Sequence, residues 1–419
     1  MNALEKIVYD IVKRNPNLKA GIVRTYQALF AVVPFARLQS IAPVNVRDGY
    51  FFGFHDKCPW SDGNKHLLAH RVLTGNRIVR QGDEIEVGYF SGSEWQEFNA
   101  VAKTQAWDWQ LGSMLQWLNK QQLLFNDFNE GRYCSKIHDI DDSKTRTLER
   151  PIVAASPDAT TGVSYDFDRV HVAMPGYGYA CRSAVPAWKD ADYPDQGKLY
   201  VVNLLNGNSE VLFTLDDILQ IDHEPSMDGA FHFFHHVLFS PNSQRFVFFH
   251  RWVCNGNQRF TRMFSCAIDG SDLHRFPTDG MVSHIGWRDS SHIFAYARVA
   301  GEDGYYLFED QSDRYERIGE ESFNSDGHPQ YSRQGLVLTD TYPDRFRLQY
   351  LAVYDPARKS RTDIARTRLP WRLHEELRVD LHPRWDRDGS IVCFDSGHTG
   401  TRSLCTMRLP EEFKSCKLQ

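Results

Sequence analysis

A histidine recurs at the same position of a repeated segment in the second half of the chain. Four segments begin with histidine, continue with an aromatic residue three positions later, and pass through a polar turn into an apolar strand; their histidines are His236, His284, His328 and His382. Imidazole is the commonest metal-binding side chain, so three or four of these groups converging on one point could hold zinc or manganese. Histidines at strand starts also serve as capping or packing residues, and the sequence leaves both explanations open.

A second set of polar residues lies where apolar strands end. Arginine supplies a cation for an anionic ligand, histidine transfers protons, and asparagine both donates and accepts hydrogen bonds. The candidates of this kind are Asn126, Arg169, His250, Arg251 and Arg298.

Two phenols stand in the segment Pro-Gly-Tyr-Gly-Tyr, which carries Tyr177 and Tyr179. Glycine on either side of Tyr177 allows backbone conformations and close approach that other residues would refuse. The segment is either a turn that presents the tyrosines to a ligand or an ordinary loop whose tyrosines pack on the rim of the fold.

The repeated segment predicts the architecture that must position these residues. Units of a turn followed by an apolar strand begin at residues 57, 114, 152, 236, 284, 328 and 382, and further strand pairs follow the later units. Four strands per unit of about 45 residues, repeated seven times, are typical of a β-propeller. We therefore predict an all-β fold, a seven-bladed β-propeller over residues 44–419, with an early strand near 44–52 completing the last blade. Two packed β-sandwiches would not explain one turn motif at one phase.

The propeller brings both residue sets to one end of the channel. The start of each inner strand lies at the same end as the finish of the second strand, so the two sets would ring one polar mouth. The longest unit carries an insertion that includes Pro175–Tyr179 and would hang over this mouth. A concave polar mouth is where a ligand is expected to bind.

Residues 1–43 predict a helical extension ahead of the propeller. Apolar residues recur at helical spacing from Leu4, Asn15-Pro16-Asn17 interrupts the pattern, and it resumes from Ile22 to Val33. We expect these helices to pack across the propeller, to form a dimer contact or to make a peripheral contact.

Composition narrows the possible functions. The 48 basic and 54 acidic residues leave a net charge of −6, which argues against nucleic-acid binding through bulk charge. No apolar run is long enough to span a membrane, and the amino terminus lacks the layout of a secretory signal, so we expect a cytoplasmic protein. Eight scattered cysteines without a C-x-x-C pair indicate reduced thiols. We expect no nucleotide cofactor.

Several segments resemble the propeller polysaccharide lyases. FFGFHDKCPW, WDWQLGSMLQWL, LFNDF, PIVAASPDA, FDRVHVAMPGYGY and the repeated turns look most like the ulvan lyase group and, more distantly, the oligogalacturonate lyases, over residues 48–409. The most specific pieces are QLGSMLQWL and PGYGY. The resemblance implies a lyase that cleaves a uronic-acid-containing glycan by β-elimination, with an acidic oligo- or polysaccharide as its partner.

Such a reaction needs a cation or metal at the substrate carboxylate, a base and an acid. The resemblance gives the tyrosine role to Tyr177 and the carboxylate role to Arg169 or Asn126. The predicted catalytic residues are Tyr177, His236, His250 and Arg169. The predicted substrate-binding residues are Asn126, Tyr179, Arg251 and Arg298. The predicted ligands of a divalent metal are His236, His284, His328 and His382.

Two alternatives from other classes stay open, and with them the question of whether the protein is an enzyme. Where the lyases are expected to carry histidines, this chain has Trp109 and Asn126–Asp127, which favours a non-catalytic glycan-binding or scaffold propeller. The lack of an export signal favours an enzyme that assembles capsule or lipopolysaccharide inside the cell. A peptidase propeller is disfavoured, because the chain has no G-x-S-x-G nucleophile motif.

Overall fold

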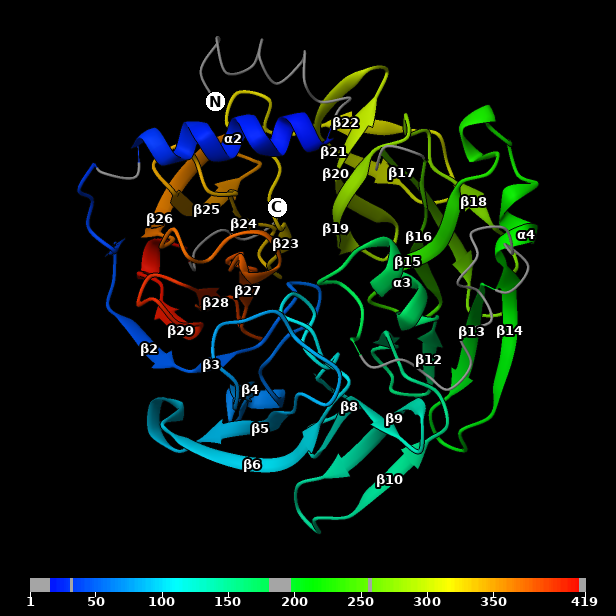
Figure 1. Cartoon of the computed structure of the whole chain (residues 1–419), viewed down its shortest axis with the longest axis horizontal. Coiled ribbons are helices and arrows are strands. Elements are labelled where there is room, and N and C mark those ends of the chain that lie inside the picture. Colours follow the sequence, from blue (N-terminus) through cyan, green and yellow to red (C-terminus); the bar gives the residue numbers. More distant parts are fainter. Residues whose placement is uncertain (1–15, 31–32, 181–196, 255–257, 414–419) are drawn as a thin grey trace.

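Seven antiparallel sheets surround a central axis in the computed structural model, which describes residues 16–30, 33–180, 197–254 and 258–413 (Figure 1). Each sheet is one blade of a β-propeller, and the predicted seven-bladed fold is confirmed. The first blade contains β3 (Tyr50–Phe51), β4 (Leu67–Val72), β5 (Ile85–Ser91) and β6 (Glu97–Thr104), the second β7 (Gln116–Trp117), β8 (Gln122–Asn129), β9 (Arg132–Asp139) and β10 (Thr145–Leu148), and the third β11 (Ala154–Ala155), β12 (Thr161–Ser164), β13 (Lys198–Asn203) and β14 (Ser209–Thr214). The fourth blade contains β15 (Phe231–Phe239), β16 (Arg245–Val253), β17 (Arg259–Ala267) and β18 (His274–Arg275), and the fifth β19 (Val282–Asp289), β20 (His292–Val299), β21 (Glu302–Glu309) and β22 (Tyr315–Arg317). The sixth blade contains β23 (Gln330–Tyr331), β24 (Val337–Asp340), β25 (Leu348–Asp355), β26 (Ser360–Arg368) and β1 (Leu38–Ser40), and the seventh β27 (Arg384–Trp385), β28 (Ile391–Ser396), β29 (Ser403–Arg408) and β2 (Val44–Asp48).

The ring closes through the early part of the chain. β2 pairs with β29 from Val44 opposite Met407 to Asp48 opposite Ser403, so an early strand completes the seventh blade as predicted. The predicted strand over 44–52 divides at Gly49, whose φ of 81° is readily adopted by glycine. Beyond that turn, β3 opens the first blade.

The N-terminal extension contains one described α-helix, α2 (Pro16–Phe30). Residues 38–40 form β1 on the open edge of β26, so the helical prediction through residue 43 is too long. Unpaired backbone groups at a sheet edge attract another strand, and helical periodicity gives no sign of this. The predicted helix from Leu4 lies outside the described residues. No helix in the described ranges combines the length and apolarity needed to cross a bilayer.

Apolar side chains fill the space between neighbouring blades. Every residue of β16 from Phe246 to Trp252 is buried, because blades cover both faces of the fourth sheet. Phe248 stacks on Phe213 of the third blade and on Phe264 of its own. Strands covered on both faces read as continuous apolar runs rather than as an alternation.

Short helices occur mainly in the connections. The remaining α-helices are α3 (Phe167–Ala173) and α4 (Leu215–Leu219), and the described 3-10 helices are Asp62–Asn64, Ser93–Trp95, Pro225–Met227, Glu375–Leu377 and Glu411–Phe413. α3 and the turn that follows it connect β12 to β13, so this insertion lies at the end of the channel where the inner strands begin.

Candidate functional site

The four histidines of the repeat surround Phe54 on the propeller axis. The centroid of the Phe54 ring lies between 4.7 and 6.0 Å from those of His236, His284, His328 and His382. All four imidazoles are buried, with exposed fractions from 0 to 8%. The repeat therefore gathers these histidines in one place. His236 and His284 lie within the inner strands β15 and β19, whereas His328 and His382 lie two residues before β23 and β27, so the predicted position at the strand start does not hold for His236.

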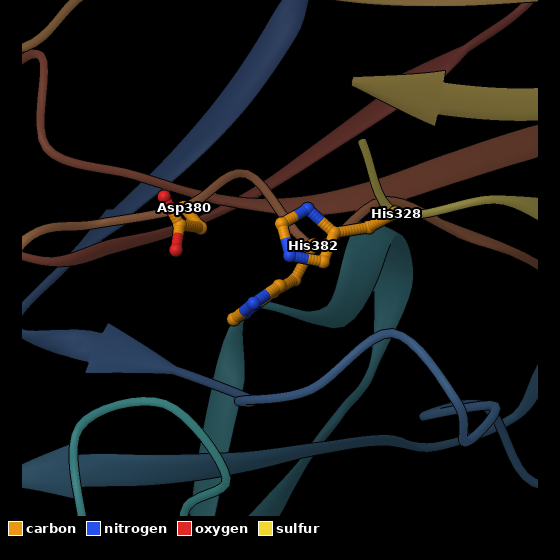
Figure 2. A group of neighbouring side chains, drawn as sticks. All are labelled: His328, Asp380 and His382. Carbon is orange, nitrogen blue, oxygen red and sulfur yellow. The ribbon is translucent and has the colours of Figure 1, made fainter. Parts of the chain in front are cut away.

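Two of these histidines converge with a carboxylate (Figure 2). The possible ligand atoms of His328, Asp380 and His382 all lie within 4.8 Å of one another. His328 Nδ1 donates to Asp340 at 2.8 Å, which leaves its Nε2 without a partner among the described residues. Neither ring nitrogen of His382 has a hydrogen-bond partner there. The group thus offers unpaired imidazole nitrogens beside a carboxylate.

Asp380 is held as an anion by its neighbour on the same segment. Arg378 donates from Nε and Nη2 to the two oxygens of Asp380, each at 2.7 Å. Burial alone would raise the pKa of Asp380, but the guanidinium outweighs it and holds that pKa below its usual value. An ionised carboxylate and neutral imidazoles are the forms that bind a divalent metal.

A further carboxylate, that of Asp340, fixes the backbone of both histidines. Asp340, the last residue of β24, accepts the backbone N–H of His328 at 2.8 Å and that of His382 at 3.2 Å. His382 has a φ of 42°, a left-handed conformation that is uncommon outside glycine. Asp340 also orients the His328 ring, as carboxylates do for histidines that bind metals.

Of the four predicted metal ligands, His328 and His382 belong to the convergent group found among the described residues. His236 stacks on Phe54 and is not in that group, and neither is His284, although its ring lies 4.1 Å from that of His328. His284 instead pairs through Nδ1 with Asp326 at 3.1 Å. The repeat places the four histidines at equivalent positions of their blades. Phe54, which lies among them, comes from the first blade and does not belong to the repeat.

Two more histidines reach this cluster from outside the repeat phase. The His55 ring lies 5.3 Å from that of His328, and the His235 ring lies 4.1 Å from that of His236. All ring nitrogens of His55 and His235 lack partners within the part of the chain that the structure describes. Burial lowers the pKa of both histidines, so both are neutral at physiological pH. Sequence reasoning missed them, although His235 directly precedes a predicted ligand.

The half-buried Tyr177 and its turn, Pro175–Tyr179, lie over the cluster and are called the rim below. The Tyr177 ring is 6.0 Å from that of His235, and its phenol lies within electrostatic range of Arg378 and Asp380. Burial raises the pKa of Tyr177, which keeps the phenol protonated. The Pro-Gly-Tyr-Gly-Tyr turn thus brings Tyr177 next to His235, and the catalytic role predicted for Tyr177 stays a prediction.

Arg251 lies beneath the rim as a weakly bound cation. It is 6% exposed, and its Nε has no partner within the described ranges. Nη1 reaches only the sulfur of Met174 and Nη2 only the carbonyl of Val282, each at 3.4 Å. Burial lowers its pKa to about 9, so the guanidinium remains charged at neutral pH. Such a cation can receive an anionic group at little cost in broken contacts.

The structure places His250 and Arg169 away from the mouth. Arg262 donates to His250 Nδ1 at 3.1 Å, so His250 Nε2 donates to His232, which in turn donates to the Met227 carbonyl. Arg169 donates to the His232 carbonyl and lies over the Phe231 ring at 4.5 Å. These contacts lie between the third and fourth blades, so the catalytic roles predicted for both residues lose their geometric basis.

Three predicted substrate-binding residues are engaged in the fold itself. Asn126 donates to the Ile152 carbonyl at 3.0 Å and to the Tyr179 hydroxyl at 2.9 Å, and it accepts from the Ile152 N–H at 2.8 Å. Tyr179 is fully buried and stacks on Phe167 at 4.2 Å. Arg298 pairs with Asp303. Of the four predicted substrate-binding residues, Arg251 alone is placed under the rim.

Replacing Asn126 with alanine should reduce stability without removing a ligand contact. The substitution leaves the buried N–H and C=O of Ile152 and the Tyr179 hydroxyl unpaired, which costs about 2–4 kcal/mol of unfolding free energy. Urea unfolding measures this loss. Asn129→Ala, at the exposed end of the same strand, should change stability by about 0.5 kcal/mol or less. A stable Asn126→Ala protein with weakened glycan binding would return Asn126 to the site.

Comparison with solved structures supports the fold assignment. An oligogalacturonate lyase in complex with manganese aligns at a TM-score of 0.59 and 16% identity, over 90% of this chain and 94% of its own. The oligogalacturonate lyase from Vibrio parahaemolyticus aligns at a TM-score of 0.59 and 15% identity, with the same two coverages. The class that fold and site define is therefore a seven-bladed propeller with a buried histidine cluster at its mouth. No protein-family model and no curated protein sequence matches this chain.

These structural similarities test part of the resemblance found in the sequence. The likeness to oligogalacturonate lyases holds at the level of the fold, since identities of 15–16% carry no further conclusion. The likeness to the ulvan lyase group stays a prediction.

Proposed function

We propose that the protein is a metal-dependent lyase that cleaves an acidic, uronate-containing oligo- or polysaccharide by β-elimination. The observation that carries this proposal is the buried group of His328, Asp380 and His382, together with the half-buried Tyr177 above it and the buried, weakly bound Arg251. A lyase of the same fold has been solved with manganese, which favours this ion over zinc.

The donor set suits a divalent ion. Two imidazoles and one carboxylate form a mixed nitrogen and oxygen set of the kind that manganese and zinc accept. His328 presents Nε2 while Asp340 holds its other nitrogen, which fixes the ring orientation. A bound ion would supply positive charge close to the substrate carboxylate.

The remaining chemistry falls to residues of this chain. Arg251 would bind the uronate carboxylate and stabilise the charge that develops when the neighbouring proton leaves. His236 would be the base: burial holds its pKa well below the usual value, which keeps the imidazole neutral but weakens it as a base, so the transfer would depend on cations at the uronate carboxylate that acidify the proton. The protonated phenol of Tyr177 would donate a proton to the leaving oxygen.

Glycan binding without catalysis is the second candidate. His328 and His382 are at most 1% exposed, so a substrate reaches them only if the rim residues move aside. A non-catalytic propeller would bind the sugar at Tyr177 and the other rim residues alone. The predicted cytoplasmic location and a role in polysaccharide assembly stay predictions.

Oligogalacturonates offer a direct test. Purified protein loaded with manganese should cleave oligogalacturonates and release products with an unsaturated uronate, which is detected by its ultraviolet absorbance. Chelation of the metal should stop the reaction. A panel with other uronates, ulvan included, identifies the preferred glycan. Binding detected by calorimetry without any unsaturated product would support the glycan-binding propeller and overturn the lyase.

A further inference from the structure

Helix α2 lies on the same end of the propeller as the candidate site. It runs beside the sixth blade (Figure 1) and contacts the connection between β24 and β25, which lies at the end of the channel where the inner strands begin. Gln27 is only 8% exposed, whereas Leu29 two residues later is 70% exposed. The helix therefore directs one polar side chain inward.

The Gln27 amide makes three hydrogen bonds with this connection. Its Nε2 donates to the carbonyls of Pro343 at 3.1 Å and Asp344 at 2.9 Å. Its Oε1 accepts from Nη1 of Arg347 at 3.1 Å. Phe30, one helical turn later, packs edge-on against Phe346 at 5.1 Å.

Arg347 extends these contacts to a second segment. The guanidinium is buried and donates to the carbonyls of Leu369, Pro370 and Leu373, in the connection between the sixth and seventh blades. Gln27 thus provides the acceptor for the remaining terminal nitrogen of a buried arginine. Loss of that acceptor leaves a buried charged donor unpaired.

Both segments carry residues of the candidate site. Tyr342 directly precedes Pro343, and its ring lies 5.6 Å from that of His328. The connection fixed by Arg347 continues to Arg378, whose guanidinium lies 4.7 Å over the Tyr342 ring, and then to Asp380 and His382. The two segments therefore meet at the site and share one anchor on α2.

We propose that Gln27 is a positioning residue for the site. It fixes the connection 341–347 directly and the segment 369–382 through Arg347, so that Tyr342, Asp380 and His382 keep their relative places. This inference rests on the proposed function for its manganese measurement only. An apolar cover or a dimer contact would not need a directional amide at this position.

Gln27→Met, which keeps the length of the side chain and removes the amide, tests the inference in the full-length protein. Hydrogen exchange by mass spectrometry should be about tenfold faster in peptides from 341–347 and 369–382. The manganese affinity, measured well below the unfolding temperature of each protein, should fall about tenfold. Gln39→Met is the matched control, because Gln39 is exposed on β1 of the same blade, and it should change neither quantity.

Gln27→Glu separates the hydrogen bonds that Gln27 donates to the connection 341–347 from the one that it accepts from Arg347. A carboxylate still accepts from Arg347 but cannot donate to the carbonyls of Pro343 and Asp344, so exchange should rise in 341–347 and stay near the parent value in 369–382. Faster exchange of Gln27→Met confined to α2, or unchanged manganese affinity in a protein that binds manganese, would overturn the inference. If the parent protein binds no manganese, the metal part of the proposed function is wrong, and the exchange data alone decide the positioning role.

Discussion

Tyr177→Phe should lower the turnover of the acidic glycan by about 10²–10⁴-fold while leaving its binding nearly intact. The phenol is kept protonated by burial and lies within electrostatic range of Arg378 and Asp380, so its loss removes the proton donor for the leaving oxygen. Phenylalanine keeps the ring that contacts His235. Steady-state rates of unsaturated product and calorimetric affinity are the two measurements.

Tyr179→Phe provides the control for this change. Tyr179 belongs to the same turn, but its hydroxyl is bound to Asn126 inside the propeller, so its removal should affect stability rather than turnover. A parent protein that forms no unsaturated product, and whose Tyr177→Phe variant loses only about one hydrogen bond of binding energy, about 1 kcal/mol, would fit a non-catalytic glycan-binding module. Equal losses of turnover in both variants would remove the special role of Tyr177.

His382→Ala should weaken manganese binding by at least about 100-fold. The substitution removes one of the two imidazoles in the convergent group, while Asp340 still holds His328. Elemental analysis of the purified protein and titration with manganese measure the change. Turnover should fall with metal content and should recover at least in part on addition of excess metal, because mass action refills a weakened site.

His223→Ala controls for the loss of an imidazole as such, because His223 is exposed, pairs with Asp228 and does not belong to the convergent group. It should leave manganese binding unchanged. If the parent protein contains no metal and takes up none on titration, the histidines of the cluster serve packing, and the site must act through Arg251 and the neutral imidazoles alone.

The sequence predicts the architecture well because the repeat encodes it. His236, His284, His328 and His382 lie within or just before the inner strands of four consecutive blades, and an early strand closes the ring as the repeat requires. Repetition fixes what every blade shares. It does not fix Phe54, which comes from the first blade and packs against all four histidine rings.

Side-chain direction accounts for the misplaced catalytic residues. His250 and Arg251 are neighbours on β16, so their side chains point to opposite faces of the sheet. One joins a chain of hydrogen bonds between blades, and the other reaches the mouth. Asp380 was missed for a related reason: it precedes the inner strand by an irregular connection, and no period in the sequence signals where its carboxylate points.

The closure of the ring also has a consequence for synthesis. β1 and β2 leave the ribosome early, whereas their partners β26 and β29 are among the last strands made. At about 5–20 residues per second, the intervening chain takes on the order of tens of seconds to produce. Two strands must remain unpaired for that time, and Arg47 and Asp48 in β2 are charged side chains of the kind that discourages pairing with the wrong chain. β1 and β2 are thus translated long before the partners that complete their blades.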